Sequence, residues 1–373
     1  MTDTTVKYFD STMSGAPVLS GTAGALISVL DACLVNGFGS VTLDSLVVAD
    51  DVATGTISTG HGFAMFGVLT GPVITIEGAT PSELNGEWRI ASVPSSTTFT
   101  FVTEDISDQT ATGTITAKRS PAGMTKPFSG TNLAAYRSAA PGTQFYLRIN
   151  DTTTTYATMR GYEAMSDIST GTNPYPTVAQ AANCYFYKAS STSSTRPWCA
   201  ISDSKMLYVF SDAGLNSNYS GNFSWGDLIS YLETDQYHSQ ILYSTGSSSS
   251  SYLGNLANAT GAYIARAYTG LDLGPVSSHR YSSGRGTVVG NNTQRFPMPI
   301  NNKALFWPIE VWENSATAAR GLMPGFYNPL HSTASILLQN VVVTDSVHLP
   351  GRELMFLAID SYFGAFDITG PWR

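Results

Sequence analysis

The sequence predicts a mainly β protein with a minor α component (α+β), and three observations support this prediction. Short segments rich in β-branched and aromatic residues recur along the chain, separated by Gly, Pro, Asn and Asp. A helical spacing of apolar residues is clear only near the start, at 20–36. Charged residues make up 12% of the chain, so hydroxyl and amide side chains must cover much of the surface. We therefore expect a β-rich body, a capped N-terminal helix and an inserted small β-barrel-like module.

A length of 373 residues favours two or three domains. Residues 1–42 are predicted to form the N-terminal part of the body, with the helix. Residues 43–118 are predicted to form the inserted β module. Residues 119–373 are predicted to form the main β-rich body, with a long Gly/Ser/Asn-rich loop or arm near 270–302.

The predicted helix covers Ser20–Asn36, where Ser20 or Thr22 can cap the free N–H groups at its start. Gly37 and Gly39 follow, where a helix needs a left-handed exit. The apolar positions fall on one face and should pack on the body as plain core: Leu26, Ile27, Leu30, Cys33 and Leu34.

The module is predicted from strand-like segments with turn residues between them, of which Asn85-Gly86 is the strongest turn signal. Ala53–Ser58 is repeated almost unchanged as Ala111–Thr116, so these segments should pair or lie adjacent at the rim of the module. The predicted strands are Leu46–Val48, Val52–Ser58, Val73–Ile76, Trp88–Val93 and Thr97–Val102.

The body is predicted from similar segments, with Trp198–Ile201 pairing with Met206–Phe210 across a turn. Ser224–Asp227 has the pattern that caps a short helix at 228–232, and 244–251 is a low-complexity loop. The aromatic end, 366–373, suggests packing on the body or on a neighbour. Further strands are expected at 145–149, 185–188, 241–243, 305–312, 336–343 and 354–359.

The net charge of −8 and the scattered Lys and Arg residues argue against nucleic acid as a partner. No stretch of about 18 apolar residues is present, so we expect no membrane insertion. The first ten residues lack the pattern of a signal peptide. We therefore expect synthesis and assembly in a cytoplasm.

The residue patterns predict no enzyme, no metal, no cofactor and no catalytic residue. Cys33, Cys184 and Cys199 are too few and too widely spaced for a disulfide framework, although a bridge between the last two stays open. The histidines form no metal-ligand pair and are His61, His238, His279, His331 and His348.

Acidic residues near the C-terminus leave a glycosidase as a minor alternative, because such enzymes need two carboxyl groups about 5–10 Å apart. The residues concerned are Asp367, Asp360 and Glu353, with His348 nearby in sequence.

Five tyrosines lie in a polar context and suit either core and interface packing, which we favour, or a receptor-glycan site. They are Tyr185, Tyr187, Tyr231, Tyr237 and Tyr243.

Two resemblances to known proteins follow from these segments. The module resembles a repeat found in many phage structural proteins and named after the small β domain (FCCH-like) of ubiquitin-activating enzymes. The segments that carry it are Thr59–Phe63, Val73–Thr80, Leu84–Gly86 and Thr97–Phe101. A broader resemblance is to a family of tailed-bacteriophage virion structural proteins. It is carried by Met13–Gly24, Asp31–Gly39, Lys126–Arg137 and Arg320–Leu330.

The first resemblance implies a compact β insert and no ubiquitin chemistry. The second implies a non-enzymatic component of the virion, assembled in the host bacterial cytoplasm. Its partners would be copies of itself and other phage structural proteins, and its expected place is the tail or baseplate. The alternatives are a head decoration or head-fibre protein, and a tail module that binds host surface glycan.

Overall fold

The computed structural model describes residues 3–189, 194–212, 219–243, 262–275, 277–280, 300–313, 318–329, 341–343, 346, 348–359 and 362–373. Antiparallel strands dominate these residues and form four sheets, accompanied by a single short α-helix. The predicted fold class, mainly β with a helix near the N-terminus, is confirmed. Within the described part of the chain, no helix has the length and apolar character needed to cross a bilayer.

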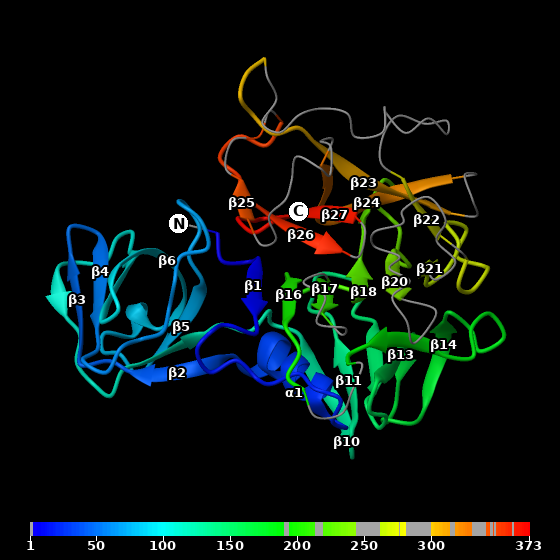
Figure 1. The fold of residues 1–373 in the computed structure, drawn as a ribbon, viewed down its shortest axis with the longest axis horizontal. Coiled ribbons are helices and arrows are strands. Elements are labelled where there is room, and N and C mark those ends of the chain that lie inside the picture. The colour runs from blue at the N-terminus through cyan, green and yellow to red at the C-terminus, as the bar shows by residue number, and fades with distance from the viewer. Residues whose placement is uncertain are drawn as a thin grey trace.

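The first sheet curls into a small barrel on one side of the molecule (Figure 1). The segment after its last strand turns back onto the residues that follow an inner strand, because Thr112 exchanges two backbone hydrogen bonds with Thr80. We call this sheet the barrel. In spatial order its strands are β2 (Phe38–Thr42), β9 (Thr116–Arg119), β5 (Val73–Glu77), β6 (Gly86–Ser95), β7 (Thr98–Val102), β4 (Val52–Thr56), β3 (Ser45–Ala49) and β8 (Gln109–Thr110).

All five strands predicted for this region are present, because side chains alternate between a buried face and an exposed face along them. The repeated segments lie on either side of the same strand, β3, and are not paired with each other. Val48 of β3 pairs with Ala53, and Val47 pairs with Thr110, next to the second copy. The prediction that the two segments pair or lie adjacent is therefore wrong, and both segments are instead neighbours of β3.

A two-residue hairpin of the barrel lies at Asp50-Asp51, whereas no such hairpin forms at Asn85-Gly86. Ala49 pairs directly with Val52, and the two residues between them have φ angles of 50° and 59°. Positive φ at both central residues is the backbone of a type I′ turn, which is favoured in two-residue hairpins. Asn85 acts instead through its side chain, which bonds to both backbone groups of Ala79.

The body has three stacked sheets (Figure 1). The middle sheet contains the predicted pairing of 198–201 with 206–210, and its first strand comes from the extreme N-terminal region. In order its strands are β1 (Lys7–Asp10), β16 (Trp198–Ser202), β17 (Met206–Ser211), β18 (Gly221–Asp227), β20 (Ser239–Tyr243) and β21 (Ala262–Ile264).

The sheet on one side of the middle sheet contains β10 (Thr125–Gly130), β11 (Leu133–Arg137), β12 (Tyr146–Asn150), β13 (Tyr156–Met165), β14 (Gly171–Tyr175) and β15 (Cys184–Tyr187). The sheet on the other side contains β22 (Ser277–Arg280), β23 (Phe306–Glu313), β24 (Ala318–Pro329), β27 (Tyr362–Asp367), β26 (Leu354–Ile359), β25 (Val341–Val343) and β19 (Ile229–Ser230). β22 corrects part of the loop predicted at 270–302, because its backbone pairs with β23. The predicted loop at 244–251 and residues 281–299 lie outside the described residues.

Burial on both faces explains the continuous apolar character of the middle sheet. Along β17, Leu207 and Val209 belong to one core cluster, whereas Tyr208 and Phe210 belong to the cluster on the opposite face. A strand covered on both sides needs apolar residues at every position and therefore loses the alternation of a half-exposed strand.

The predicted helix is shorter than expected, and its cap is different. α1 covers Ala25–Asp31 and continues as a π-helical segment, Ala32–Asn36. Neither Ser20 nor Thr22 caps it. The carboxylate of Asp151, 125 residues further on, accepts hydrogen bonds from Leu26 N (2.8 Å) and Ile27 N (3.4 Å).

Asp151 also forms a fully buried ion pair with Lys188, so this cap is part of the core. Of the predicted helix face, Ile27 is half-buried and the other four residues, Leu26, Leu30, Cys33 and Leu34, are buried. Gly37 ends the helical segment with φ 71° and ψ 178°, which is a positive-φ conformation but not the left-handed helical one that was predicted, and Gly39 (φ 68°) lies within β2.

The barrel is fixed to the body by charged side chains. Arg89 of β6 is 5% exposed and donates to the carbonyl oxygens of Asp3, Val6, Gly71, Ile368 and Thr369. Arg119 donates to the carbonyls of Ser14 and Gly62, and the buried carboxylate of Glu353 accepts from Leu69 N at 2.7 Å. The barrel therefore shares a polar joint with both ends of the body. The three-domain division itself stays a prediction.

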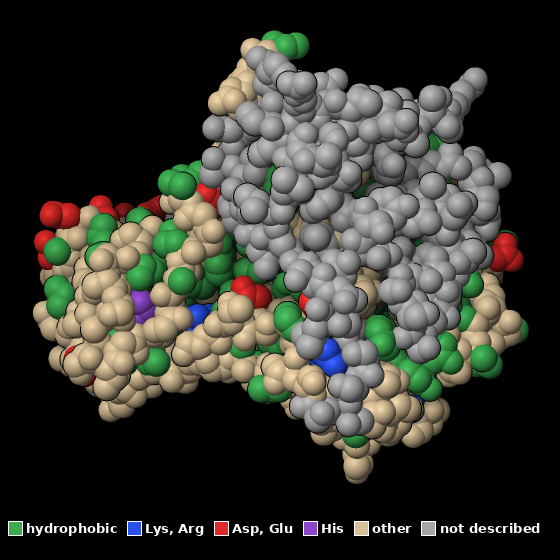
Figure 2. Space-filling model, in the orientation of Figure 1, with side chains coloured by type: hydrophobic (Ala, Val, Ile, Leu, Met, Phe, Trp, Pro, Cys, Tyr) green, Lys and Arg blue, Asp and Glu red, His purple; other side chains and the backbone are tan. Residues whose placement is uncertain are grey.

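Acidic side chains gather at the outer end of the barrel, far from this joint (Figure 2). The exposed members are Asp50, Asp51, Glu104, Asp105 and Asp108. A surface of this sign repels phosphate groups and disfavours contact with nucleic acid at this end.

Candidate functional site

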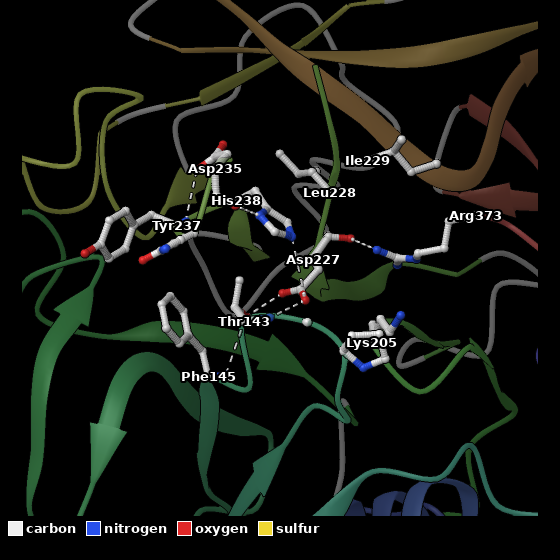
Figure 3. Close-up of a pocket in the computed structure, with 13 residues that line it drawn as sticks. Thr143, Phe145, Lys205, Asp227, Leu228, Ile229, Asp235, Tyr237, His238 and Arg373 are labelled. Carbon is white, nitrogen blue, oxygen red and sulfur yellow. Dashed lines mark hydrogen bonds and ion pairs between the residues drawn. The ribbon is translucent and has the colours of Figure 1, made fainter. Parts of the chain in front are cut away.

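A cleft of about 600 Å³ opens where the sheets of the body meet (Figure 3). Its walls come from the loop before β12, the turn between β16 and β17, the segment from β18 to β20, and the last residue. The side chains that give it chemical character are Thr143, Phe145, Lys205, Asp227, Tyr237, His238 and Arg373.

Asp227 is fully buried in the wall of the cleft, and a glycine places it there. Gly226 has φ 132°, and a Cβ atom at this position would lie 2.0 Å from the Lys205 carbonyl oxygen. The close approach lets Asp227 N donate to the same oxygen at 3.0 Å. Thr143 donates to the Asp227 carboxylate from its backbone N (2.9 Å) and its Oγ1 (2.6 Å). These two hydrogen bonds hold the buried carboxylate within the wall of the cleft.

The helix predicted at 228–232 is absent. Asp227 ends β18, and Ile229 pairs with Leu322 of β24 in the short strand β19. Leu228 N donates to the His238 carbonyl. The backbone donors that a helix would use are thus taken by neighbouring strands, and the expected capping carboxylate binds Thr143 instead.

His238 lies beside Asp227 with one ring nitrogen open to the cleft (Figure 3). Its Nδ1 is 2.5 Å from the Asp235 carbonyl oxygen, which can only accept, so Nδ1 carries the hydrogen. Its Nε2 is 3.9 Å from Asp227 Oδ2, beyond hydrogen-bond distance. In the neutral ring Nε2 is therefore an acceptor.

A buried arginine fixes the turn that carries His238. Arg320 is 3% exposed and contacts both carboxylate oxygens of Asp235, at 2.7 and 2.9 Å. It also pairs with Glu313 at 2.5 Å. Burial opposes ionisation of Asp235, but the hydrogen bonds from Arg320 and from Tyr237 N outweigh it and hold its pKa below the ordinary value.

Two cations border the cleft. Arg373 donates from Nε to Asp203 Oδ2 and from Nη1 to the Asp227 carbonyl, each at 3.1 Å. Lys205 is half-buried, and its Nζ has no hydrogen-bond or ion-pair partner within the described part of the chain. Trp372 packs against Gly325, which confirms that the aromatic end of the chain packs on the body.

Two aromatic rings complete the wall. Those of Phe145 and Tyr237 have centroids 6.5 Å apart. The Arg266 guanidinium lies 4.6 Å from the centroid of the Tyr237 ring and pairs with Glu163. Arg266 therefore covers one face of Tyr237 and fixes the orientation of its ring.

The acidic residues considered for a glycosidase are used structurally. Asp367 accepts from Thr369 N and pairs with Arg352, and burial raises its pKa. Glu353 binds the barrel through Leu69, and His348 is exposed. Asp360 lies outside the described residues. None of the described three lines the cleft.

The three cysteines are buried and free, so the open question of a bridge between Cys184 and Cys199 is answered in the negative. Burial raises the pKa of the Cys184 thiol to about 12. His61 stacks on Phe63 in the barrel, and His331 lies outside the described residues. Among the residues that the structure describes, no three His, Cys, Asp or Glu side chains are grouped as metal ligands.

The five predicted tyrosines separate into different roles. Tyr243 is buried in the core, Tyr185 packs edge-on against Tyr156, and Tyr187 is half-buried at the end of β15. Tyr231 is 54% exposed, and Tyr237 lines the cleft. Sequence reasoning missed the other cleft residues, because they come from segments far apart in the chain.

The chain matches no protein-family model and no curated protein. It is similar to the solved structure of an endosialidase of phage phi92, with a TM-score of 0.17 and 10% sequence identity. The superposition covers 89% of this chain and 52% of that chain. A likeness at this level defines neither a shared fold nor a shared activity.

Proposed function

We propose that the chain is a non-enzymatic structural component of a tailed-phage virion, in the tail or baseplate region. It would act through contacts with its own copies and with neighbouring virion proteins. The resemblance of Met13–Gly24 and Lys126–Arg137 to such proteins supports the virion assignment. The structure contributes one observation that favours contact between copies.

That observation is a group of exposed, rigidly held side chains, which we call the tyrosine patch. Its members are Tyr231, Leu232, Tyr268 and Leu271, with exposed fractions of 54%, 47%, 58% and 81%. Large apolar side chains exposed to this extent favour an interaction surface when they gather on one face, and tyrosine is enriched in protein interfaces.

Both loops that carry the patch are attached to the same buried arginine. Tyr231 N donates to the Arg320 carbonyl, and Tyr268 N donates to Glu313 Oε2, the atom that Arg320 contacts. Arg320 also donates to the Arg266 carbonyl at 2.8 Å. Loops fixed in this way lose little conformational entropy on association, which favours binding.

The oligomeric state of the purified chain tests this proposal. We expect a closed ring by native mass spectrometry, in which the tyrosine patch of each copy contacts a different surface of the next and the rotation between copies closes. The triple variant Tyr231→Ser, Leu232→Ser, Leu271→Ser should shift the population to monomer. A matched control, Val47→Ser with Val102→Ser, removes exposed apolar side chains from the barrel and should leave the ring intact.

The copy number in the particle tests the location. A low number, consistent with a tail or baseplate ring, is expected from quantitative mass spectrometry of purified virions. Hundreds of copies would contradict it and favour a head decoration protein. A native chain that is already monomeric, or a ring that survives in the triple variant, would contradict the role of the tyrosine patch.

A further inference from the structure

Lys188 and Asp151 bring an amine and a carboxyl group into contact inside the core of the body. Lys188 Nζ contacts Asp151 Oδ1, and both side chains are 0% exposed. Asp151 directly follows β12 and Lys188 directly follows β15. These two strands pair with opposite edges of β13, so the sheet fixes the positions of both residues. Two groups that can react with each other are thus held together and shielded from water.

The second oxygen of the Asp151 carboxyl group is held by backbone donors. Asp151 Oδ2 accepts from Leu26 N at 2.8 Å and from Ile27 N at 3.4 Å. Donors in this position stabilise the negative charge that develops on an oxygen when its carbon is attacked. Lys188 Nζ also donates to the Thr22 carbonyl at 2.8 Å, which orients the amine. One carboxyl oxygen therefore contacts the amine, and the other contacts donors suited to an oxyanion.

We propose that Lys188 and Asp151 condense to an isopeptide bond that joins the ends of β15 and β12. A proton moves from Nζ to Oδ1 within the ion pair, and the freed lone pair of Nζ forms a bond with Cγ. The bond between Cγ and Oδ1 then breaks, and Oδ1 leaves as water with two of the three ammonium protons. The third proton stays on the amide nitrogen, so atoms and charge balance without any other reactant.

The surroundings fit the amide as well as they fit the ion pair. Asp151 Oδ2 becomes the carbonyl oxygen of the amide and keeps its donors, Leu26 N and Ile27 N. The single amide hydrogen can donate to the Thr22 carbonyl, the acceptor that Nζ already has. Two buried charges disappear in the reaction, which removes the cost of their desolvation and favours the product.

Burial and contact both favour the reaction. Burial raises the pKa of Asp151 above its ordinary value although Lys188 acts in the opposite direction. A raised pKa favours the neutral acid, which an amine attacks more readily than a carboxylate. Well-oriented groups in one molecule react as if at concentrations of about 10⁵–10⁸ M. This inference does not depend on the proposed virion role, because condensation needs only the folded chain.

Intact-mass spectrometry of the full chain tests the proposal. After purification and incubation at neutral pH, the native chain should be lighter than its sequence by the mass of one water molecule. Lys188→Met should have the full mass of its own sequence. Tandem mass spectrometry of a tryptic digest should show one branched peptide in which Lys188 is joined to Asp151.

The ion pair of Lys126 with Asp31 provides a matched control within the same chain. Lys126 Nζ and Asp31 Oδ2 are 2.6 Å apart, but the two side chains are 25% and 21% exposed. The other oxygen of Asp31 accepts from the Tyr136 hydroxyl and not from backbone N–H groups. No cross-link should form at this pair, and Lys126→Met should keep the mass deficit of the native chain.

A native chain with the full mass of its sequence would overturn the proposal, whether or not the variants fold. A mass deficit that persists in Lys188→Met would also overturn it, because a cyclic imide at Asp151 loses water without any amine from Lys188. Equal cross-linking of Lys126 with Asp31 would contradict the requirement for a buried pair with backbone donors.

Discussion

The barrel and the three-layered body are both antiparallel, yet different interactions specify them. In the barrel, consecutive strands form hairpins such as β3 with β4 and β5 with β6. In the body, the middle sheet begins with a strand from the other end of the sequence, as Lys7 pairs with Ser202. Buried ion pairs also cross the body, as between Arg320 and Asp235. Consecutive strands pair in both regions, so the regions differ most in their polar contacts: buried ion pairs cross the body, whereas the pair between Lys118 and Glu77 in the barrel is largely exposed.

The largest effect is expected from breaking a long-range contact in the body. Arg320→Met would leave the carboxylates of Asp235 and Glu313, each 2% exposed, without their cation. Uncompensated buried charge should lower the free energy of unfolding by about 3–5 kcal/mol, measured by urea denaturation.

The control for this variant is Lys118→Met in the barrel, whose partner Glu77 is 57% exposed. An exposed pair of this kind contributes about 0–1 kcal/mol. Equal losses in the two variants would contradict the view that buried ion pairs hold the body.

The joint between the regions should show the next largest effect. Arg89→Met would remove the donors to five carbonyl groups and should lower the free energy of unfolding by roughly 2–3 kcal/mol. Amide hydrogen exchange should rise at 66–71, next to the joint, while the strands of the barrel stay protected. Loss of protection throughout the barrel would mean that the barrel cannot fold without its contacts with the body. Lys7→Met, which breaks the neighbouring pair with Glu87, should have a smaller effect.

A pH series should sharpen the role of Asp235. Its pKa in the folded protein lies below the ordinary value of 3.8. The ionised form therefore contributes stability that is present above that value and is lost as the pH falls through the lowered pKa. The stability difference between the native chain and Asp235→Asn should be largest near neutral pH and should shrink below about pH 4. A difference that grows on acidification would contradict this assignment.

The smallest effect should be a gain in the barrel. Asp50→Asn with Asp51→Gly places residues suited to positive φ in the β3–β4 turn and should stabilise the chain by about 0.5–1 kcal/mol in thermal unfolding. Asn85→Ala should destabilise it, because that side chain holds Ala79 through two hydrogen bonds. A gain at both positions would contradict the different roles of the two turns.

These differences explain how much could be predicted. The strands of the barrel and the β16–β17 pair have local patterns, and the structure contains them. The cap on α1 comes from Asp151, which is distant in sequence, so the nearer Ser20 and Thr22 were the natural but wrong choice.

The site was less accessible to sequence reasoning. The segment before Leu228 has a capping pattern, but strand pairing with Leu322 overrides it and turns Asp227 toward Thr143. Lys205, His238 and Arg373 have no motif in common, because only the packing of three sheets brings them together.

The carbonyls that hold Arg89 also set an order of events during synthesis. The barrel strands lie between 38 and 119, whereas two of the carbonyl partners of Arg89 belong to Ile368 and Thr369. Domains generally fold in the order in which the ribosome releases them. The contacts that hold Arg89 are therefore incomplete until Ile368 and Thr369 have emerged, long after the last strand of the barrel.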